Sequence, residues 1–513
     1  MDSVISKAIE EGIPVLLAVA GLFFILVAIA EIEKIKINGK PLRFFSASIG
    51  FSLLVIGVSL YLQGSNTSVT DEPNIDESDI ETLVELPSDW FSSGESIIFS
   101  GHSNADRDFG VAEFKDNNYD QAANFFEKAV FADPNDPEVQ IYLNNSKIRK
   151  LTSRVVLAAI VPAEKEQNYA EAILRGVADS QRLCNENQQT AIEILIVDDG
   201  NDINRVSKVS NQVVEMKVNN KEIVGVIGHY TSSATREGLK AYDQSNLAVI
   251  SPTSTSDFLQ SKVFFRTPPS DRLNGSELAK YVIRSLGKVE VEVLYTPDDP
   301  YSESLLRAFK TEFEKLGGTT QENDISAGDL NVENFIESLD EEVSAIVLLP
   351  SADFAARAIA LSRVTKGTNS RNALPLFGGD TLYSPEILQG GGSAVEGLVI
   401  AIPWFPTERS AYATRASERW GGQVNWATAM SFDATQAFCY AISDKTSISR
   451  SDIIESLNSI SVPASDTSGA QFSFDSSGNA TRSPVLVKVV NALEDPEVDT
   501  PRDTNYGFKL IEQ

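Results

Sequence analysis

Histidine and cysteine are scarce in this sequence, since each occurs only twice among 513 residues. No cysteine, histidine or acidic residue stands at metal-ligand or catalytic-triad spacing from His229, although zinc sites and nucleophilic enzymes require such patterns. The glycine run at residues 390–392 lacks the lysine and the hydroxyl residue of a phosphate-binding loop. The sequence therefore favours neither an enzyme nor a bound cofactor, and we interpret His229 as structural.

Basic residues are also few, because 43 Lys and Arg stand against 72 Asp and Glu, which gives a formal net charge of −29. Nucleic-acid binding needs a basic surface, so the composition argues against nucleic acid as a partner. Residues 65–106 hold ten Asp or Glu and no Lys or Arg. Such a segment cannot form a core of its own, so we predict an acidic linker there. Within it, WFSSGESIIF at residues 90–99 is more apolar, and we expect it to dock on the following domain.

Two long apolar runs near the start of the chain, residues 13–30 and 44–62, contain no charged residue. Each is long enough to cross a bilayer as a helix. The connector carries four basic residues between positions 34 and 43, and such loops stay in the cytoplasm. We therefore predict a transmembrane hairpin over residues 1–64. The expected location is the cytoplasmic (inner) membrane, with the later domains in the periplasm or at the cell exterior. A cleaved signal peptide is the alternative, but its first segment should be basic, whereas MDSVISKAIEEG is net acidic.

Residues 107–150 resemble a single tetratricopeptide repeat, because small, aromatic and proline residues stand at that repeat's positions. These residues are Gly110, Ala112, Phe114, Tyr119, Ala122, Phe126, Ala129 and Pro134. A solenoid needs about three repeats to bury its faces. One repeat must therefore cap itself with flanking helices, pack on the next domain or recruit a protein partner. An ordinary helical hairpin acting as a collar is an equal alternative.

From residue 151 onward, short apolar strands alternate with helical patterns, which is typical of doubly wound α/β lobes. The predicted strands are residues 154–162, 192–198, 223–228, 247–251, 291–295, 345–350, 374–379 and 397–403, and the predicted helices include 170–183, 303–316 and 352–364. Two of the strands end in hydroxyl-rich turns, TSS at 231–233 and SPTST at 251–255. Ligands bind at the carboxyl ends of strands in open α/β sheets, and a helix N-terminus there binds carboxylates. Ser and Thr also favour helix caps, which is the alternative interpretation.

Cys184 and Cys439 both fall in helix-like parts of this region. A disulfide between them can form in an oxidising compartment, but the sequence leaves the pairing open. Neither cysteine lies in a lipobox-like context near the N-terminus, so a lipid anchor is not predicted.

An ordered series of motifs links this region to a known family. The motifs are VVLAAIVP (155–162), YAEAILRG (169–176), GVIGHYTSSAT (225–235), SPTSTSDF (251–258), FFRTPPSD (264–271), YTPDDPYSESL (295–305), LFGGDTLYSPEIL (376–388) and SFDATQAF (431–438). Together they resemble the receptors of branched-chain amino acid ABC transporters, the type I periplasmic binding proteins. The resemblance implies a two-lobed α/β (Venus-flytrap) fold over residues 151–513. Its three hinge crossings would fall near residues 265–268, 395–402 and 469–479.

The resemblance also implies a ligand pocket. The family's carboxylate-binding positions match Ser232, Thr253 and Thr255, and its ammonium-binding acid matches Asp380. Its cleft aromatics match Tyr169 and Tyr301. An N-cap role is the alternative for Asp380, and a surface loop position is the alternative for the two tyrosines.

One position departs from the family pattern. Several relatives carry an aromatic residue after the strand at 345–349, where this chain has Ser351. That difference puts a branched-chain ligand in doubt.

The sequence therefore predicts a membrane-tethered receptor for a small amino-acid-like ligand, which it delivers to an ABC permease by opening and closing its lobes. A non-transport sensor or scaffold, for example in cell-wall synthesis, is the alternative. That alternative would rely on the helical collar as the site for a protein partner.

Overall fold

The computed structural model describes residues 87–513, apart from residues 188, 368–373, 408–409, 444–447, 496–497, 499, 502 and 513. The predicted transmembrane hairpin and the first part of the acidic linker lie outside the described residues. None of the described helices is long and apolar enough to cross a membrane.

The first lobe is built on a sheet with the strand order β1-β3-β2-β5-β6-β7, and β4 pairs with β5. Its strands are β1 (Phe91–Ser92), β2 (Arg154–Val161), β3 (Ala191–Asp198), β4 (Lys217–Val218), β5 (Lys221–Ile227), β6 (Ala248–Ser251) and β7 (Phe264–Arg266). The central strands run parallel, whereas β1 and β4 are antiparallel additions. Every residue of β2 and β3 is buried, as expected for parallel strands covered by helices on both faces.

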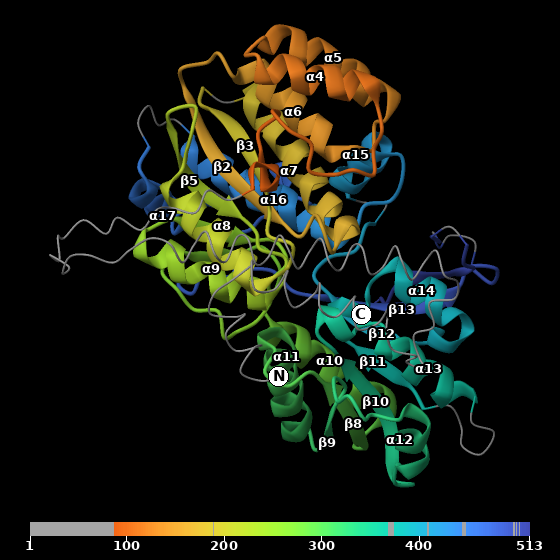
Figure 1. Ribbon diagram of the computed structural model, residues 1–513. Helices are drawn as coiled ribbons and strands as arrows, with labels where there is room; N and C mark the ends of the chain where they lie inside the picture. Colours follow the sequence, from red (N-terminus) through yellow and green to blue (C-terminus); the bar gives the residue numbers. More distant parts are fainter. Residues whose placement is uncertain are drawn as a thin grey trace, which may run out of the picture. The chain divides into compact units, whose positions relative to one another are not determined.

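Helices from two distant parts of the chain cover this sheet. They are α7 (Gln167–Asn187), α8 (Ile203–Glu215), α9 (Ser232–Gln244), α15 (Ala411–Trp420), α16 (Trp426–Ile442) and α17 (Arg450–Leu457). Figure 1 shows α16, in blue, beside α7, in yellow. A Cβ atom at Gly176 of α7 would overlap the carbonyl oxygen of Thr428 in α16, so the glycine permits this close crossing. The Cys184–Cys439 disulfide links the same two helices.

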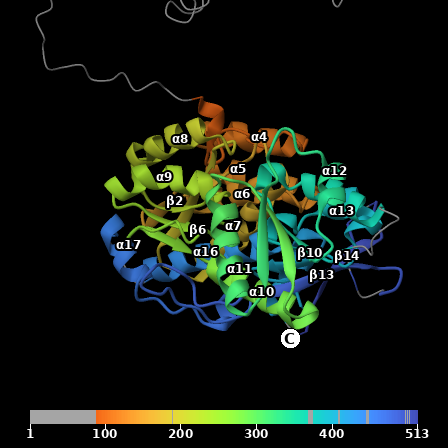
Figure 2. The same cartoon turned by 90° about the horizontal axis from the view of Figure 1, so that it is seen from below.

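The second lobe has the strand order β14-β13-β12-β11-β10-β8-β9. Its strands are β8 (Glu290–Tyr295), β9 (Thr319–Asp324), β10 (Val343–Leu349), β11 (Leu376–Gly378), β12 (Val399–Ile402), β13 (Val485–Asn491) and β14 (Tyr506–Leu510). Its helices are α10 (Asp271–Leu286), α11 (Pro300–Lys315), α12 (Val332–Ser338), α13 (Arg357–Gly367) and α14 (Pro385–Gly391). Figures 1 and 2 both show α10 and α11 side by side at the edge of this lobe.

The chain passes between the two lobes three times. The first passage follows β7 and the third precedes β13, close to the predicted crossings at 265–268 and 469–479. The second prediction, residues 395–402, was wrong by a few positions, because Val399–Ile402 is the buried strand β12, paired with β11 and β13. The actual passage follows this strand, before α15.

Three helices precede the first lobe, and we call them the collar: α4 (Ala105–Lys115), α5 (Tyr119–Ala132) and α6 (Pro137–Ile148). A Cβ atom at Gly110 of α4 would overlap the Phe126 ring of α5, and Ala122 is fully buried. Small residues therefore allow these two helices to approach. Helix α6 is buried along almost its whole length and contacts α7 and β3. The resemblance to a tetratricopeptide repeat stays a prediction.

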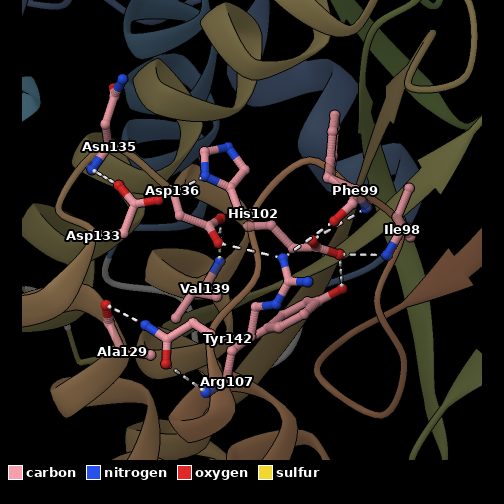
Figure 3. Close-up of polar contacts among 12 residues, drawn as sticks. Ile98, Phe99, His102, Arg107, Ala129, Asp133, Asn135, Asp136, Val139 and Tyr142 are labelled. Atoms are coloured by element: carbon pink, nitrogen blue, oxygen red, sulfur yellow. Dashed lines mark hydrogen bonds and ion pairs between the residues drawn. The ribbon is translucent and has the colours of Figure 1, made fainter.

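The segment before the collar is packed against it, as we expected for WFSSGESIIF. Strand β1 pairs with β3, and the backbone N–H groups of Ile98 and Phe99 donate to the Glu138 carboxylate at 2.6 and 3.2 Å. The Tyr142 hydroxyl donates to the same carboxylate at 2.7 Å (Figure 3). Burial raises the pKa of Glu138 to about 7.

His102 connects this segment with both the collar and the first lobe. Its Nδ1 lies 2.7 Å from Asp133 Oδ2 of the collar, and its Nε2 lies 3.3 Å from Glu171 Oε1 of α7. Its hydrogen bond to Glu171 raises the pKa of His102 to about 9. The imidazole is therefore charged at neutral pH and joins two acidic groups on different elements.

Candidate functional site

A small cavity lies between the lobes, where the strand ends of both sheets meet. From the first lobe it is lined by Tyr169, Tyr230, Thr231, Ser232, Thr253 and Trp426, and from the second by Asp299, Tyr301, Ala352, Asp380 and Thr381. Its volume is about 40 Å³, on a measure by which one ordered water needs about 10–15 Å³. The space suits a small solute. A larger hollow of about 610 Å³ adjoins the cavity between the same two lobes and shares Tyr169, Tyr230, Ala352 and Thr381 with it.

The first-lobe side of the cavity is the N-terminus of α9. Thr231 caps this helix, because its hydroxyl accepts from Ala234 N–H at 3.2 Å. The next residue, Ser232, has a buried Oγ without a hydrogen-bond partner in the described part of the chain. Thr253 is held by its hydroxyl, which donates to the carbonyl oxygens of Tyr230 (2.7 Å) and His229 (3.1 Å). A helix N-terminus beside hydroxyl groups favours a carboxylate.

The second-lobe side of the cavity is acidic. Asp380 begins the short 3-10 helix η3 (Asp380–Leu382) and is only 4% exposed. Burial raises the pKa of its carboxyl to about 6, while the Tyr301 hydroxyl and nearby backbone N–H groups act in the opposite direction. None of the described residues that line the cavity is Lys, Arg or His. A ligand that brings its own positive charge therefore fits this side.

Asp380 does not act as the helix cap considered from the sequence. Ser384 fills that role for α14, because its Oγ accepts from Ile387 N–H at 3.3 Å. Asp380 makes no side-chain cap. Helix capping therefore does not explain why a carboxylate stands at this position.

Aromatic side chains form the walls of the cavity. The Tyr169 and Tyr230 rings pack against each other with their planes tilted by 31° and their centroids 4.7 Å apart. Trp426, the first residue of α16, is 4% exposed, and its indole N–H has no hydrogen-bond partner in the described part of the chain. The walls combine apolar ring surface with a few polar groups, the usual composition of a small-molecule site.

Five of the six residues predicted from the sequence meet at the cavity: Tyr169, Ser232, Thr253, Tyr301 and Asp380. Thr255 is not among the lining residues. It is fully buried at the passage between the lobes, where its carbonyl oxygen accepts from Asp271 N–H at 2.8 Å.

His229 lies behind the cavity and is fully buried. Its Nδ1 is 2.6 Å from Asp199 Oδ2, and its Nε2 is 2.8 Å from the Tyr242 hydroxyl. These contacts orient the turn that carries Tyr230 and Thr231, which agrees with a structural role.

Sequence reasoning missed six lining residues: Tyr230, Thr231, Asp299, Ala352, Thr381 and Trp426. Tyr230 and Thr231 stand in the same GHYTSS turn as Ser232, so the strand-end argument reaches them. The position of Asp299 in the sequence is typical of a helix N-cap. Asp299 does cap α11, since its side chain accepts from Ser302 N–H. Trp426 begins a helix far along the chain, and no local pattern brings it to the cavity.

The two lobes touch each other around the cavity. Ser233 Oγ donates to Asp299 Oδ2 at 3.0 Å, and Asn168 Nδ2 donates to Glu386 Oε1 at 2.9 Å. On another side, Ser256 Oγ donates to the Pro300 carbonyl oxygen at 2.6 Å. Contacts of this kind exist only while the lobes are together, so they stabilise a closed arrangement.

Two α/β lobes, three passages between them and a cavity shared by both define a two-lobed ligand-binding receptor. A sequence profile described as "Periplasmic binding protein" matches residues 167–493. The match covers more than half of the chain, so this protein belongs to the periplasmic binding protein family.

Curated relatives of this chain include solute-binding proteins for amino acids. The Leu/Ile/Val/Thr-binding protein of Salmonella typhimurium is 28% identical over 149 residues, which are 28% of this chain and 39% of that protein. The chain thus matches about two-fifths of the length of that relative.

Solved structures show the same fold over a longer stretch. The crystal structure of a leucine-binding protein from Thermotoga maritima has 18% identity and a TM-score of 0.60, and covers 70% of this chain and 98% of that one. A solute-binding protein of an ABC transporter from Rhodopseudomonas palustris, solved with 3,4-dihydroxybenzoic acid, has 14% identity and a TM-score of 0.58, with 69% and 96% covered. Since their ligands differ, the fold does not by itself identify the ligand of this chain.

Proposed function

We propose that this protein is a membrane-anchored extracytoplasmic receptor that binds a small amino-acid-like ligand and delivers it to an ABC permease. One observation carries the proposal: a site for a negative charge and a site for a positive charge face each other across the cavity. The N-terminus of α9, with Ser232, faces the space from one lobe, and the buried Asp380 faces it from the other.

This arrangement suits a zwitterion. A buried charge is costly unless it is paired, and charge-assisted hydrogen bonds are the strong ones. An α-carboxylate at the helix N-terminus and an α-ammonium at Asp380 would each gain a partner when the lobes close. The amino-acid-binding relatives support this choice over an uncharged solute.

The location belongs to the same proposal. The apolar runs at residues 13–30 and 44–62 with a basic connector support a hairpin in the cytoplasmic membrane. The Cys184–Cys439 disulfide supports an oxidising compartment for the receptor domain. A reporter fused after Gly64 should be active outside the cytoplasm. Activity on the cytoplasmic side would contradict the proposed location.

A thermal-shift screen of the full-length chain against amino acids, amides and urea tests the binding function. A ligand at a hundredfold excess over its dissociation constant adds about 2.7 kcal/mol to the free energy of unfolding. We expect at least one amino acid to raise the melting temperature and the Asp380→Ala variant to lose that response. A panel without any shift would contradict the receptor function.

The collar favours a second candidate, a sensor or scaffold that reports the state of the lobes to a protein partner. Helix α6 contacts α7, and α7 carries Tyr169 at the cavity. Hydrogen exchange of α5 and α6 with and without ligand distinguishes the two functions. Ligand-dependent protection in the collar favours the sensor, and an unchanged collar favours simple delivery.

A further inference from the structure

The indole N–H of Trp426 is a polar group that the amino-acid-binding scheme leaves unused. The residue lines the cavity, and its Nε1 atom is buried without a hydrogen-bond partner in the described part of the chain. An indole N–H is a donor only. Leaving a buried donor unsatisfied is costly because its hydrogen bonds to water are lost and not replaced, so the site is incomplete until something supplies an acceptor.

The backbone groups of an amino acid already have their own partners in the cavity. Ser232 and the α9 N-terminus take the carboxylate, and Asp380 takes the ammonium. These groups come from a strand end and from η3, whereas Trp426 comes from α16, a third element that reaches the cavity separately. The remaining part of the ligand, which the indole N–H can serve, is the side chain.

We propose that Trp426 makes the site selective for amino acids whose side chain carries an oxygen acceptor near Cα, such as a hydroxyl or a short amide. This proposal rests on the proposed receptor function. An apolar side chain of the same shape would leave the indole N–H buried and unpaired. A site built around a hydrogen-bonding group discriminates strongly against the analogue that lacks it.

The size and outline of the cavity agree with a short polar side chain. The enclosed space is about 40 Å³, and the rings of Tyr169, Tyr230 and Tyr301 limit it on several sides. On the second lobe, Ala352 leaves the cavity next to a hollow of about 610 Å³ that both share. Size therefore does not exclude a longer side chain, and the proposed selectivity depends on the acceptor that the indole N–H requires.

L-Threonine and L-valine are the direct probes, because their side chains have nearly the same shape and differ in one hydroxyl. We expect the full-length protein to bind threonine about five- to a hundredfold more tightly than valine in calorimetry, the range that one unsatisfied buried donor produces. Trp426→Phe keeps an aromatic ring but removes the five-membered ring and its N–H, so the threonine-to-valine ratio should fall to about one to three.

Trp404→Phe is the matched control. It also removes one indole N–H, but that group donates to the Ser468 carbonyl oxygen at 3.2 Å and does not line the cavity. The ratio should be unchanged in this variant. A ratio that falls equally in both variants would overturn the proposal, as would a wild-type protein that binds valine as well as threonine.

A spectroscopic measurement gives a second readout, taken on the wild-type protein itself. The chain has four tryptophans, so the indole N–H region of a two-dimensional nitrogen–proton spectrum is simple. The peak missing in Trp426→Phe should move when threonine is added and move much less with valine. Equal shifts would overturn the proposal, since Trp426 would then serve the carboxylate common to both ligands. If threonine and valine both fail to bind, the proposal also fails; the receptor function fails with it only if the whole amino acid panel is silent.

Discussion

Asp380 is the residue on which the amino-acid hypothesis depends most, because it is the buried acid opposite the α9 N-terminus. Replacing it with alanine leaves the ligand ammonium desolvated and without its counter-charge. Truncating one partner of a buried charged pair costs about 2–5 kcal/mol, which is roughly thirty- to several-thousandfold in affinity. Ser232→Ala should cost less, about 1–3 kcal/mol, because it removes one donor among several.

Calorimetry with the amino acid found in the screen measures both losses. Thr255→Ala is the control, since that side chain does not line the cavity, and its affinity should stay within about twofold, a difference well under 1 kcal/mol. Unchanged affinity in Asp380→Ala would rule out the zwitterion scheme.

The raised pKa of Asp380 also predicts how binding depends on pH. Only the ionised carboxylate attracts an ammonium group, and burial places its pKa at about 6. Affinity should therefore be constant above neutral pH and fall as the pH drops through 6, by up to tenfold per unit. The ligand-free protein behaves oppositely: its folded state holds this proton more tightly than the unfolded chain, so the contribution of Asp380 to stability decreases as pH rises from about 4 to 6. Titrations across this range check both trends, and Asp380→Asn should show neither.

At the residue scale, the strand-end argument predicted the hydroxyl side of the site because Ser232 and Thr253 lie in the turns that follow β5 and β6. It failed for Thr255, two positions further along the same turn, because a turn reverses direction within two residues and sends that side chain toward Asp271. Trp426 was out of reach for a different reason. Its place depends on the chain returning to the first lobe after building part of the second, and no local periodicity records such a return.

At the scale of elements, the contact between α7 and α16 holds the first lobe together. Gly176→Ala would drive a methyl group into the Thr428 carbonyl oxygen, and backbone has little freedom to retreat. Inserting bulk into a packed interior typically costs about 1–3 kcal/mol. We expect at least that loss in the free energy of unfolding, measured with urea, together with weaker ligand binding because Trp426 begins α16.

Gly328→Ala is the matched control for this change. No heavy atom lies within 4 Å of an added Cβ there, so its unfolding curve should coincide with that of the wild type. Equal stability of Gly176→Ala and Gly328→Ala would mean that the two helices can separate without cost.

The predicted elements were accurate where a buried strand gives a continuous apolar run, as in β2, β3 and β10. The sequence prediction omitted β9, an edge strand whose TTQEND sequence has no fully buried residue and no apolar run. It predicted a strand at 397–403, which β12 confirms, but it also expected the second crossing near 395–402. The chain crosses only after this strand, because VIAI pairs with both β11 and β13 inside the second sheet.

At the scale of the whole molecule, one covalent bond joins residues on either side of the long second-lobe segment that runs from α10 to β12. Replacing Cys184 and Cys439 with serine should lower the free energy of unfolding by about 2–5 kcal/mol while the cavity keeps its ligand affinity. Chemical unfolding of the oxidised protein, the reduced protein and the double variant measures this. Detection of two free thiols in the purified, unreduced protein would contradict the pairing.

The sequence separation of 255 positions between those two cysteines also delays their pairing during synthesis. Ribosomes add about 5–20 residues per second, so roughly 13 to 50 seconds separate the appearance of α7 from that of α16. Throughout this interval the face of the first sheet that α16 will cover has no partner, and its apolar residues are open to any other unfinished chain. A nascent chain that stops before Trp426 can neither close its cavity nor form its disulfide. Chaperones that bind the nascent chain should therefore have their longest engagement with the α7 face, and they should leave only when α16 has been synthesised.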